Sequence, residues 1–255
     1  MKDHMVIMNF TDIYKEQEFW RDGDPAWTEL TQLTGCSCYC DEEAAKVLRQ
    51  EIGKFPVKGI HFLDSGNYHY MSLLWMEKID MPFRLILFDN HTDMQPPAFG
   101  GLLSCGGWAA EALEKLPHLQ EVILIGPDQE AFDQVDQEAF DQMDPEAQKR
   151  VRFLSREKLR ERHEREIIHF IEGLPTDLPY YLSVDKDVLR PGDASTSWSQ
   201  GDMKLEELLK YLELIFRNQV VLGMDVCGEC DPDSVMDGRC NDMANRKLLK
   251  LSERY

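Results

Sequence analysis

The sequence has no apolar run long enough to span a bilayer, and residues 1–10 lack the apolar core and small-residue cleavage site of a secretory signal peptide. We therefore expect a soluble, cytoplasmic protein. Its seven cysteines are an odd number in a chain without an export signal. Reduced thiols are therefore a better prediction than a framework of disulfide bonds.

Positive charge is also scarce. Lys and Arg number 28 against 47 Asp and Glu, and the formal net charge is −19 at pH 7. Such a surface repels the phosphates of nucleic acids and anionic membranes, so neither is an expected partner. The same field attracts cations, which suits divalent metal ions and small cationic substrates such as amines and guanidines.

Short apolar runs alternate with helical patterns along the chain. At 255 residues the chain is long enough for one large α/β domain, and nothing forces a second, so we predict a single domain, residues 1–255. The predicted strands are 6–10, 59–64, 84–89, 121–126, 151–154, 180–185 and 220–226. The predicted helices are 41–52, 68–78, 106–115, 157–171, 204–216 and 241–251. This alternation predicts a three-layer αβα fold with a mostly parallel central sheet.

An acidic segment is repeated almost verbatim, with residues 128–135 reading Asp-Gln-Glu-Ala-Phe-Asp-Gln-Val and residues 136–143 following the same pattern. Two copies are too few for a solenoid, so we predict short exposed helices or a loop after the fourth predicted strand. A partner-binding surface is the less favoured interpretation.

The most informative stretch is residues 85–93, Leu-Ile-Leu-Phe-Asp-Asn-His-Thr-Asp, an apolar run that ends in Asp89, His91 and Asp93. Alternation along an extended segment points these three side chains to the same side. Asp and His are ligands for manganese, nickel, iron and zinc, and open parallel sheets form ligand sites beyond the carboxyl ends of their strands. The stretch predicts a metal site, with a capped loop as the alternative.

Two further stretches place ligand residues at the ends of other predicted strands. His69 follows the second predicted strand, and the sixth ends in Asp185 and Asp187. Taken singly, each is more often a packing or turn residue. Because parallel strands end at one rim, the three stretches together predict a site for two divalent cations, with Asp89 and Asp185 as bridges. The cations would neutralise carboxylates that otherwise repel one another.

These stretches resemble the hallmark of the arginase and agmatinase family, the ureohydrolases: Gly-Gly-Asp-His, then Asp-x-His-x-Asp, then Ser-x-Asp-x-Asp. Residues 223–232, Gly-Met-Asp-Val-Cys-Gly-Glu-Cys-Asp-Pro, are similar to the family's Gly-x-Asp followed by Glu-x-Asn-Pro. The resemblance covers residues 59–251. It implies an arginase/deacetylase-like fold and a hydrolase of carbon–nitrogen bonds in linear amidines. It also implies two divalent ions, most often Mn²⁺, with Ni²⁺, Fe²⁺ or Zn²⁺ as alternatives.

The resemblance also implies a division of labour among the site residues. One ion would be held by His69, Asp89, Asp93 and Asp185, and the other by His91, Asp89, Asp185 and Asp187. A hydroxide that bridges the ions would attack the substrate, with Asp93 as general acid and base. Glu229 would pair with the substrate's guanidinium group.

The chain departs from the family in the segments around this site. Cys105 stands where the family usually carries a proton-shuttling His; a thiol could relay a proton, although a packing role at a helix start is the favoured alternative. The segment of residues 190–201 is shorter than the corresponding loop of the family. We expect Trp198, in this segment, to form an aromatic wall of a small pocket. One extra residue separates Asp225 from Glu229. The family's substrate specificity therefore does not transfer to this chain.

Other functions stay open at this stage. A deacetylase-like amide hydrolase of the same fold would use a single zinc ion, and the presence of both His69 and Asp93 argues against it. A metal-binding protein without turnover is a second alternative. A separate zinc or iron–sulfur site is less favoured, because the spacing is not that of two paired Cys-x-x-Cys units. Its candidate ligands are Cys36, Cys38, Cys40, Cys227 and Cys230. A homo-oligomer is compatible with the sequence.

Overall fold

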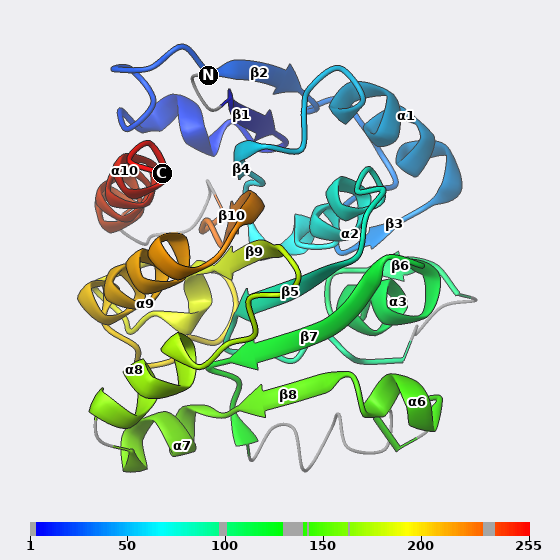
Figure 1. Cartoon of the computed structure of the whole chain (residues 1–255). Helices are drawn as coiled ribbons and strands as arrows, with labels where there is room; N and C mark the ends of the chain where they lie inside the picture. Colours follow the sequence, from blue (N-terminus) through cyan, green and yellow to red (C-terminus); the bar gives the residue numbers. More distant parts are fainter. Residues whose placement is uncertain (1–3, 97–100, 130–139, 142, 163, 232–237) are drawn as a thin grey trace.

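The chain builds an eight-stranded sheet, with every pair of neighbouring strands parallel and the order β2-β1-β4-β10-β9-β5-β7-β8 (Figure 1). The computed structural model describes residues 4–96, 101–129, 140–141, 143–162, 164–231 and 238–255. The strands are β1 His4–Asn9, β2 Ala26–Glu29, β4 Gly59–Phe62, β5 Phe83–Phe88, β7 Leu119–Ile125, β8 Val151–Leu154, β9 Tyr180–Asp185 and β10 Val221–Cys227. Strands β3 Tyr39–Cys40 and β6 Leu103–Ser104 form a separate antiparallel pair.

Helices cover both faces of the sheet. They are α1 Glu42–Ile52, α2 Met71–Met76, α3 Trp108–Lys115, α6 Pro145–Gln148, α7 Arg156–Glu161, α8 Glu164–Glu172, α9 Leu205–Asn218 and α10 Arg239–Ser252. Three short 3-10 helices are η1 Ile13–Glu16, η2 Gly66–Tyr68 and η4 Lys186–Val188. None of the described helices combines the length and apolar character needed to cross a membrane.

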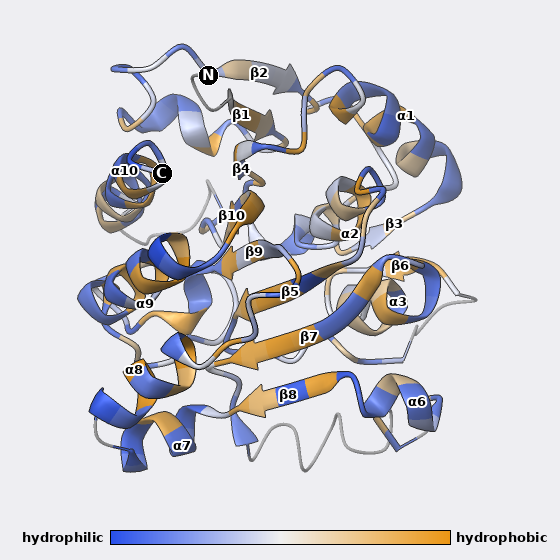
Figure 2. Cartoon of the chain, viewed as in Figure 1, coloured by the Kyte–Doolittle hydropathy of each residue, from blue (hydrophilic) through white to orange (hydrophobic). Residues whose placement is uncertain are grey.

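Alternation along the central strands divides the core in two. In β5, Leu85 and Leu87 pack with α1, α2 and α3, whereas Ile86 and Phe88 pack with α8, α9 and α10. All four side chains are fully buried, and each contributes about 1.5–3 kcal/mol of apolar transfer free energy. Figure 2 shows the apolar strands lying between helices with polar outer surfaces. This packing fixes the strand whose end carries the candidate ligands.

The predicted three-layer α/β fold is confirmed, and so are the seven predicted strands, within three residues at each end. Strand β2 was not predicted, because it is a short, half-exposed edge strand. The predicted helix 157–171 was wrong in its continuity: Arg162 adopts an extended backbone conformation and ends α7. Most of the acidic repeat lies outside the described residues.

Candidate metal centre

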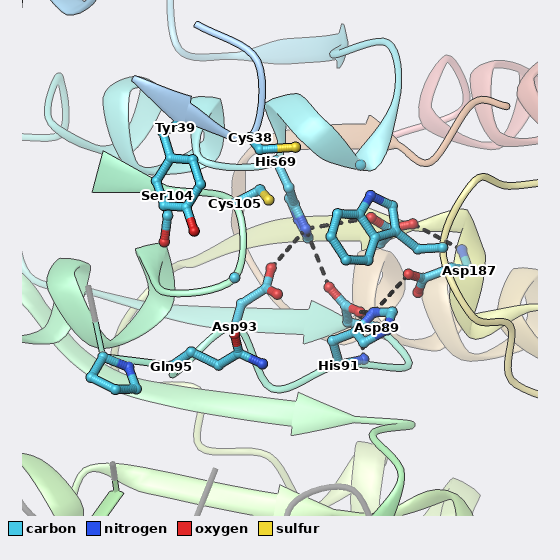
Figure 3. A pocket seen from close by; sticks show the side chains of 15 residues that line it. Cys38, Tyr39, His69, Asp89, His91, Asp93, Gln95, Ser104, Cys105 and Asp187 are labelled. Atoms are coloured by element: carbon cyan, nitrogen blue, oxygen red, sulfur yellow. Dashed lines mark hydrogen bonds and ion pairs between the residues drawn. The ribbon is translucent and has the colours of Figure 1, made fainter. Parts of the chain in front are cut away.

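The structure brings all six predicted ligands together at the carboxyl-end rim of the sheet (Figure 3). Strands β4, β10, β9 and β5 are neighbours in the sheet, so the residues that follow them meet. The six side chains line one cavity of about 230 Å³. They are His69, Asp89, His91, Asp93, Asp185 and Asp187.

One group of ligand atoms surrounds the ring of His69. Its Nδ1 lies 3.2 Å from Asp89 Oδ2, 2.9 Å from Asp93 Oδ2 and 3.5 Å from Asp185 Oδ2. Ligand atoms of His69, Asp89 and Asp93 all lie within 4.8 Å of one another. One cation could therefore contact all three.

A second group surrounds the ring of His91. Its Nδ1 lies 2.8 Å from Asp187 Oδ2 and 3.4 Å from Asp89 Oδ1. Asp89 thus presents one carboxylate oxygen to each imidazole, and it belongs to both groups. Asp89 could therefore contact a cation beside either imidazole.

Backbone amides orient the carboxylates. The amide of His91 donates to Asp89 Oδ1 at 2.7 Å, and the amide of Asn90 donates to Asp187 Oδ1 at 3.0 Å. The amide of Asp187 donates to Asp185 Oδ1 at 2.9 Å. In Asp185 and Asp187 the Oδ2 atom is therefore the one turned toward an imidazole.

Serine hydroxyl groups orient both imidazole rings. Nε2 of His69 lies 2.8 Å from Ser183 Oγ, and Nε2 of His91 lies 2.9 Å from Ser199 Oγ. A hydrogen bond at one ring nitrogen fixes the tautomer and leaves the other nitrogen for a metal. The first serine stands in a recognised motif, although the sequence analysis gave it no role. No pattern in the sequence indicated a role for Ser199.

Asp93 is held by the start of α3. Its backbone lies in the left-handed region, with φ of 52°, and its carbonyl oxygen accepts from the amide of Ala109. The buried indole of Trp108 donates from Nε1 to Asp93 Oδ2. Trp108 was not predicted from the sequence, because contact between an indole and a carboxylate fifteen residues away has no local signature.

Four carboxylates facing two imidazoles make a site that suits cations. Burial raises the pKa of Asp89 and of Asp185. Burial and the nearby charge of Asp89 raise the pKa of Asp187 to about 6. The Oδ2 atom of Asp89 is buried and has no hydrogen-bond partner. Bound divalent ions would satisfy this oxygen and favour the ionised carboxylates, and the oxygen and nitrogen donors suit Mn²⁺.

Trp198 lies on the wall of the cavity, where the sequence analysis expected it. It is 41% exposed, its Nε1 donates to Asn67 Oδ1 at 3.0 Å, and its ring meets that of His91 edge-on. A Cβ atom at Gly66 would lie 2.9 Å from Trp198 Cδ1. Glycine at position 66 is therefore what lets the indole close over the centre.

Cys105 also lines the cavity and is mostly buried. Burial and the nearby carboxylate of Asp93 raise the pKa of its thiol above the ordinary value. A thiol that holds its proton so tightly is a poor proton acceptor near neutral pH. Its predicted catalytic role stays a prediction, and the geometry favours the alternative of packing.

Glu229 is not brought to the cavity. It is fully buried; Oε1 accepts from Lys186 Nζ and Asn245 Nδ2, and Oε2 accepts from Gln17 Nε2 and Asn241 Nδ2. Lys186 lies between the predicted ligands Asp185 and Asp187 in the sequence. Its ammonium group provides the positive charge beside Glu229 that the substrate's guanidinium group was expected to provide.

Gly228 directly precedes Glu229 and has φ of 87°. A Cβ atom there would lie 2.3 Å from Asp185 Oδ1, so only glycine fits beside the ligand.

The structure does not gather the candidate ligands of the less favoured zinc or iron–sulfur site into one group of the described residues. Among the described residues, the groups of three potential ligands do not include Cys36, Cys38 or Cys40. Cys227, at the end of β10, lies instead beside the predicted ligands, with Sγ 3.1 Å from Asp185 Oδ2. In the sequence, this cysteine stood out only as half of a Cys-x-x-Cys pair.

Comparison with known proteins gives three kinds of match. A model of the arginase family matches residues 42–250. An uncharacterized protein of Thermotoga maritima is 34% identical over 247 residues, which cover 96% of this chain and 88% of that protein.

Solved structures share the fold. Proclavaminate amidino hydrolase from Streptomyces clavuligerus has a TM-score of 0.71 at 15% identity, covering 100% of this chain and 93% of that one. Formimidoylglutamase from Bacillus subtilis has a TM-score of 0.70 at 15% identity, covering 100% and 87%. Arginase from Bacillus caldovelox has a TM-score of 0.63 at 16% identity, covering 99% and 98%.

Proposed function

The chain belongs to the arginase family, and on that premise we propose that it hydrolyses a carbon–nitrogen bond in a small guanidino or other amidino compound. The observation that carries the proposal is the position of Asp89, which is shared by two groups of ligand atoms. Such an arrangement suits two ions rather than the single zinc of the deacetylase-like alternative.

The residues present fit a pair of divalent ions. His69, Asp93 and Asp185 would hold one ion and His91 and Asp187 the other, and Asp89 and Asp185 would be the ligands shared between them. Mn²⁺ is the ion we propose first, with Ni²⁺, Fe²⁺ and Zn²⁺ as alternatives. When bound, such a pair lowers the pKa of water and stabilises negative charge on a hydrolytic transition state.

The chain's own groups would position the substrate and move protons. We assign Asp93 as the group that accepts a proton from the attacking water and delivers it to the leaving amine, because its carboxylate faces the cavity. The indole of Trp108 keeps that carboxylate in place. Trp198 would shield one side of the cavity from water.

The wall of the cavity bears on the kind of substrate. Apart from the six predicted ligands, the described lining residues carry no formal charge; they include Tyr39, Gln95, Ser104 and Trp198. Glu229 is already paired with Lys186. We therefore propose that the substrate carries its charge on the amidino group and has a short, uncharged remainder.

Metal analysis and a screen for released urea, ammonia and formamide test the proposal, because formamide is the product expected from a formimidoyl group. The substrates are guanidine, agmatine, 4-guanidinobutyrate, arginine and formimidoylglutamate, the last two suggested by the names of the relatives. We expect two ions per chain and product from guanidine or a short-tailed compound. Asp93→Asn should abolish release, and Asp80→Asn, at an exposed position, should leave it unchanged.

Two results would contradict the proposal. Two bound ions without product from any amidino compound would favour a metal-binding protein without turnover. One zinc ion per chain and release of acetate from acetyl-lysine peptides would favour the deacetylase-like alternative.

A further inference from the structure

Cys227 lies against the candidate metal centre from a strand that supplies none of the six predicted ligands. In the sheet, Cys227 of β10 is the register partner of Asp185 of β9. Its side chain is 1% exposed, and its Sγ lies 3.1 Å from Asp185 Oδ2. Ligand atoms of His69, Asp185 and Cys227 all lie within 4.8 Å of one another. The sulfur is therefore within reach of a cation bound by His69.

An independent feature indicates a cation at the same place. Asp89 Oδ2, buried and without a hydrogen-bond partner, faces the same nitrogen, His69 Nδ1, at 3.2 Å. The unpartnered oxygen, which follows β5, and the sulfur, at the end of β10, thus lie beside the same imidazole. A cation placed among them would satisfy the oxygen and meet the sulfur.

We propose that Cys227 Sγ is a direct ligand of the ion held by His69, and that it makes this position prefer a thiophilic divalent ion such as Zn²⁺, Co²⁺ or Fe²⁺ to Mn²⁺. Thiolate is a soft ligand, which favours these ions over the harder Mn²⁺. The inference rests on the proposed two-ion centre. On binding, a metal–sulfur bond forms, the S–H proton passes to solvent, and no oxidation occurs.

The two positions would then differ in metal preference. The His91 group contains only nitrogen and oxygen donors, from His91, Asp89 and Asp187, which suit Mn²⁺. The His69 group would contain sulfur as well. A chain supplied with one equivalent of Zn²⁺ and an excess of Mn²⁺ is therefore expected to hold zinc beside Cys227 and manganese at the His91 group.

The competing explanation is a thiol that keeps its proton and donates a hydrogen bond to Asp185. Such a thiol would orient the carboxylate without touching the ion. The two explanations differ in whether a metal–sulfur bond exists, which spectroscopy measures directly.

The test uses full-length protein loaded with Co²⁺ or Zn²⁺. In the Co²⁺ protein we expect sulfur-to-cobalt charge-transfer absorption in the near ultraviolet, absent from Cys227→Ser and retained in Cys230→Ser. Cys230 is the matched control, because it is equally buried and lies three residues away, outside every candidate ligand group among the described residues. Cys227→Ser should also weaken Zn²⁺ binding by roughly 10–100-fold and Mn²⁺ binding much less.

X-ray absorption of the Zn²⁺-loaded wild-type protein shows whether a metal–sulfur bond exists even if Cys227→Ser does not fold. A sulfur neighbour at about 2.3 Å from zinc is expected. Two bound ions with only nitrogen and oxygen neighbours, and no charge-transfer band, would overturn the inference and leave the proposed function standing. Failure of the wild-type protein to bind ions after reconstitution would overturn both.

Discussion

The sheet contains two histidine–aspartate clusters that differ in their surroundings. In the core, His61 Nδ1 lies 2.7 Å from Asp225 Oδ1, which also accepts from Tyr181 Oη at 2.7 Å, and the imidazole stacks on Trp75. At the rim, two imidazoles face four carboxylates.

Charge balance and access separate the two clusters. The core cluster has one carboxylate for one imidazole and one phenol, whereas the rim has an excess of carboxylates. Each cluster has a buried oxygen without a hydrogen-bond partner, on Asp225 and on Asp89. Only Asp89 lines the metal-centre cavity. The same residue types therefore form a structural pair in one place and a candidate cation site in the other.

Removing the carboxylate of the core cluster should have the largest effect on stability. Asp225→Ala leaves His61 and the Tyr181 hydroxyl buried without their partner, and breaking such a buried pair costs about 3–5 kcal/mol. We expect this loss in the free energy of unfolding, measured with urea, and no change in metal bound per folded chain. A loss below about 1 kcal/mol would show that the pair is not a structural element.

Removing a carboxylate from the rim should not lower the free energy of unfolding of the metal-free protein. Asp89→Asn eliminates one of several mutually repelling buried carboxylates, so the free energy of unfolding without metal should rise or stay unchanged. Affinity for at least one of the two ions should fall by roughly 100-fold or more, since even outer partners of ligands contribute 10–100-fold. Calorimetric titration measures the affinity, and two unchanged binding events would contradict a bridging role.

The carboxylates at the rim should also make the free energy of unfolding of the metal-free protein depend on pH. The folded-state pKa of Asp187 is raised from 3.8 to about 6, so the folded state binds this proton more tightly than the unfolded state does. The free energy of unfolding should therefore fall as pH rises from about 4 to about 6.

Asp187→Asn isolates this contribution. Its free energy of unfolding should fall less than that of the wild type over the same pH window, and bound Mn²⁺ should remove the difference, because the ion favours the ionised carboxylate. Urea unfolding in a chelator and in Mn²⁺ measures both. Identical pH profiles for the two metal-free proteins would contradict the prediction.

Cys105 should show the smallest effect. Because the pKa of its thiol is raised, Cys105→Ser is expected to change turnover by less than about 3-fold and the free energy of unfolding by less than about 1 kcal/mol. Rates of product release test this once a substrate is found. A loss of 100-fold or more would restore the thiol to a catalytic role.

The sequence was most informative where burial and strand periodicity act together. The apolar run of β5 predicted both a buried strand and the rim at which Asp89 lies. Beyond the strand end, simple alternation no longer holds, because Asp93 has left-handed backbone geometry. Its return to the site depends on α3, which strand periodicity does not describe. The direction of Glu229 likewise depends on Gly228.

Contacts between distant segments were the part that the sequence could not reveal. The contact of Cys227 with Asp185 depends on the register of two strands forty-two residues apart, and Ser199 reaches His91 from a loop without a recognised motif. The domain count, the oligomeric state and the compartment stay predictions.

The buried ion pair between Lys186 and Glu229 connects the turn that carries Asp185 and Asp187 to segments near both ends of the chain. Asn241 and Asn245 bring the first two turns of α10 to it, and Gln17 brings the segment after η1. Any shift of the backbone between Asp185 and Asp187 must therefore strain the hydrogen bonds that anchor α10. Amide exchange in α10 should then be slower when ions are bound at the candidate metal centre than when they are absent.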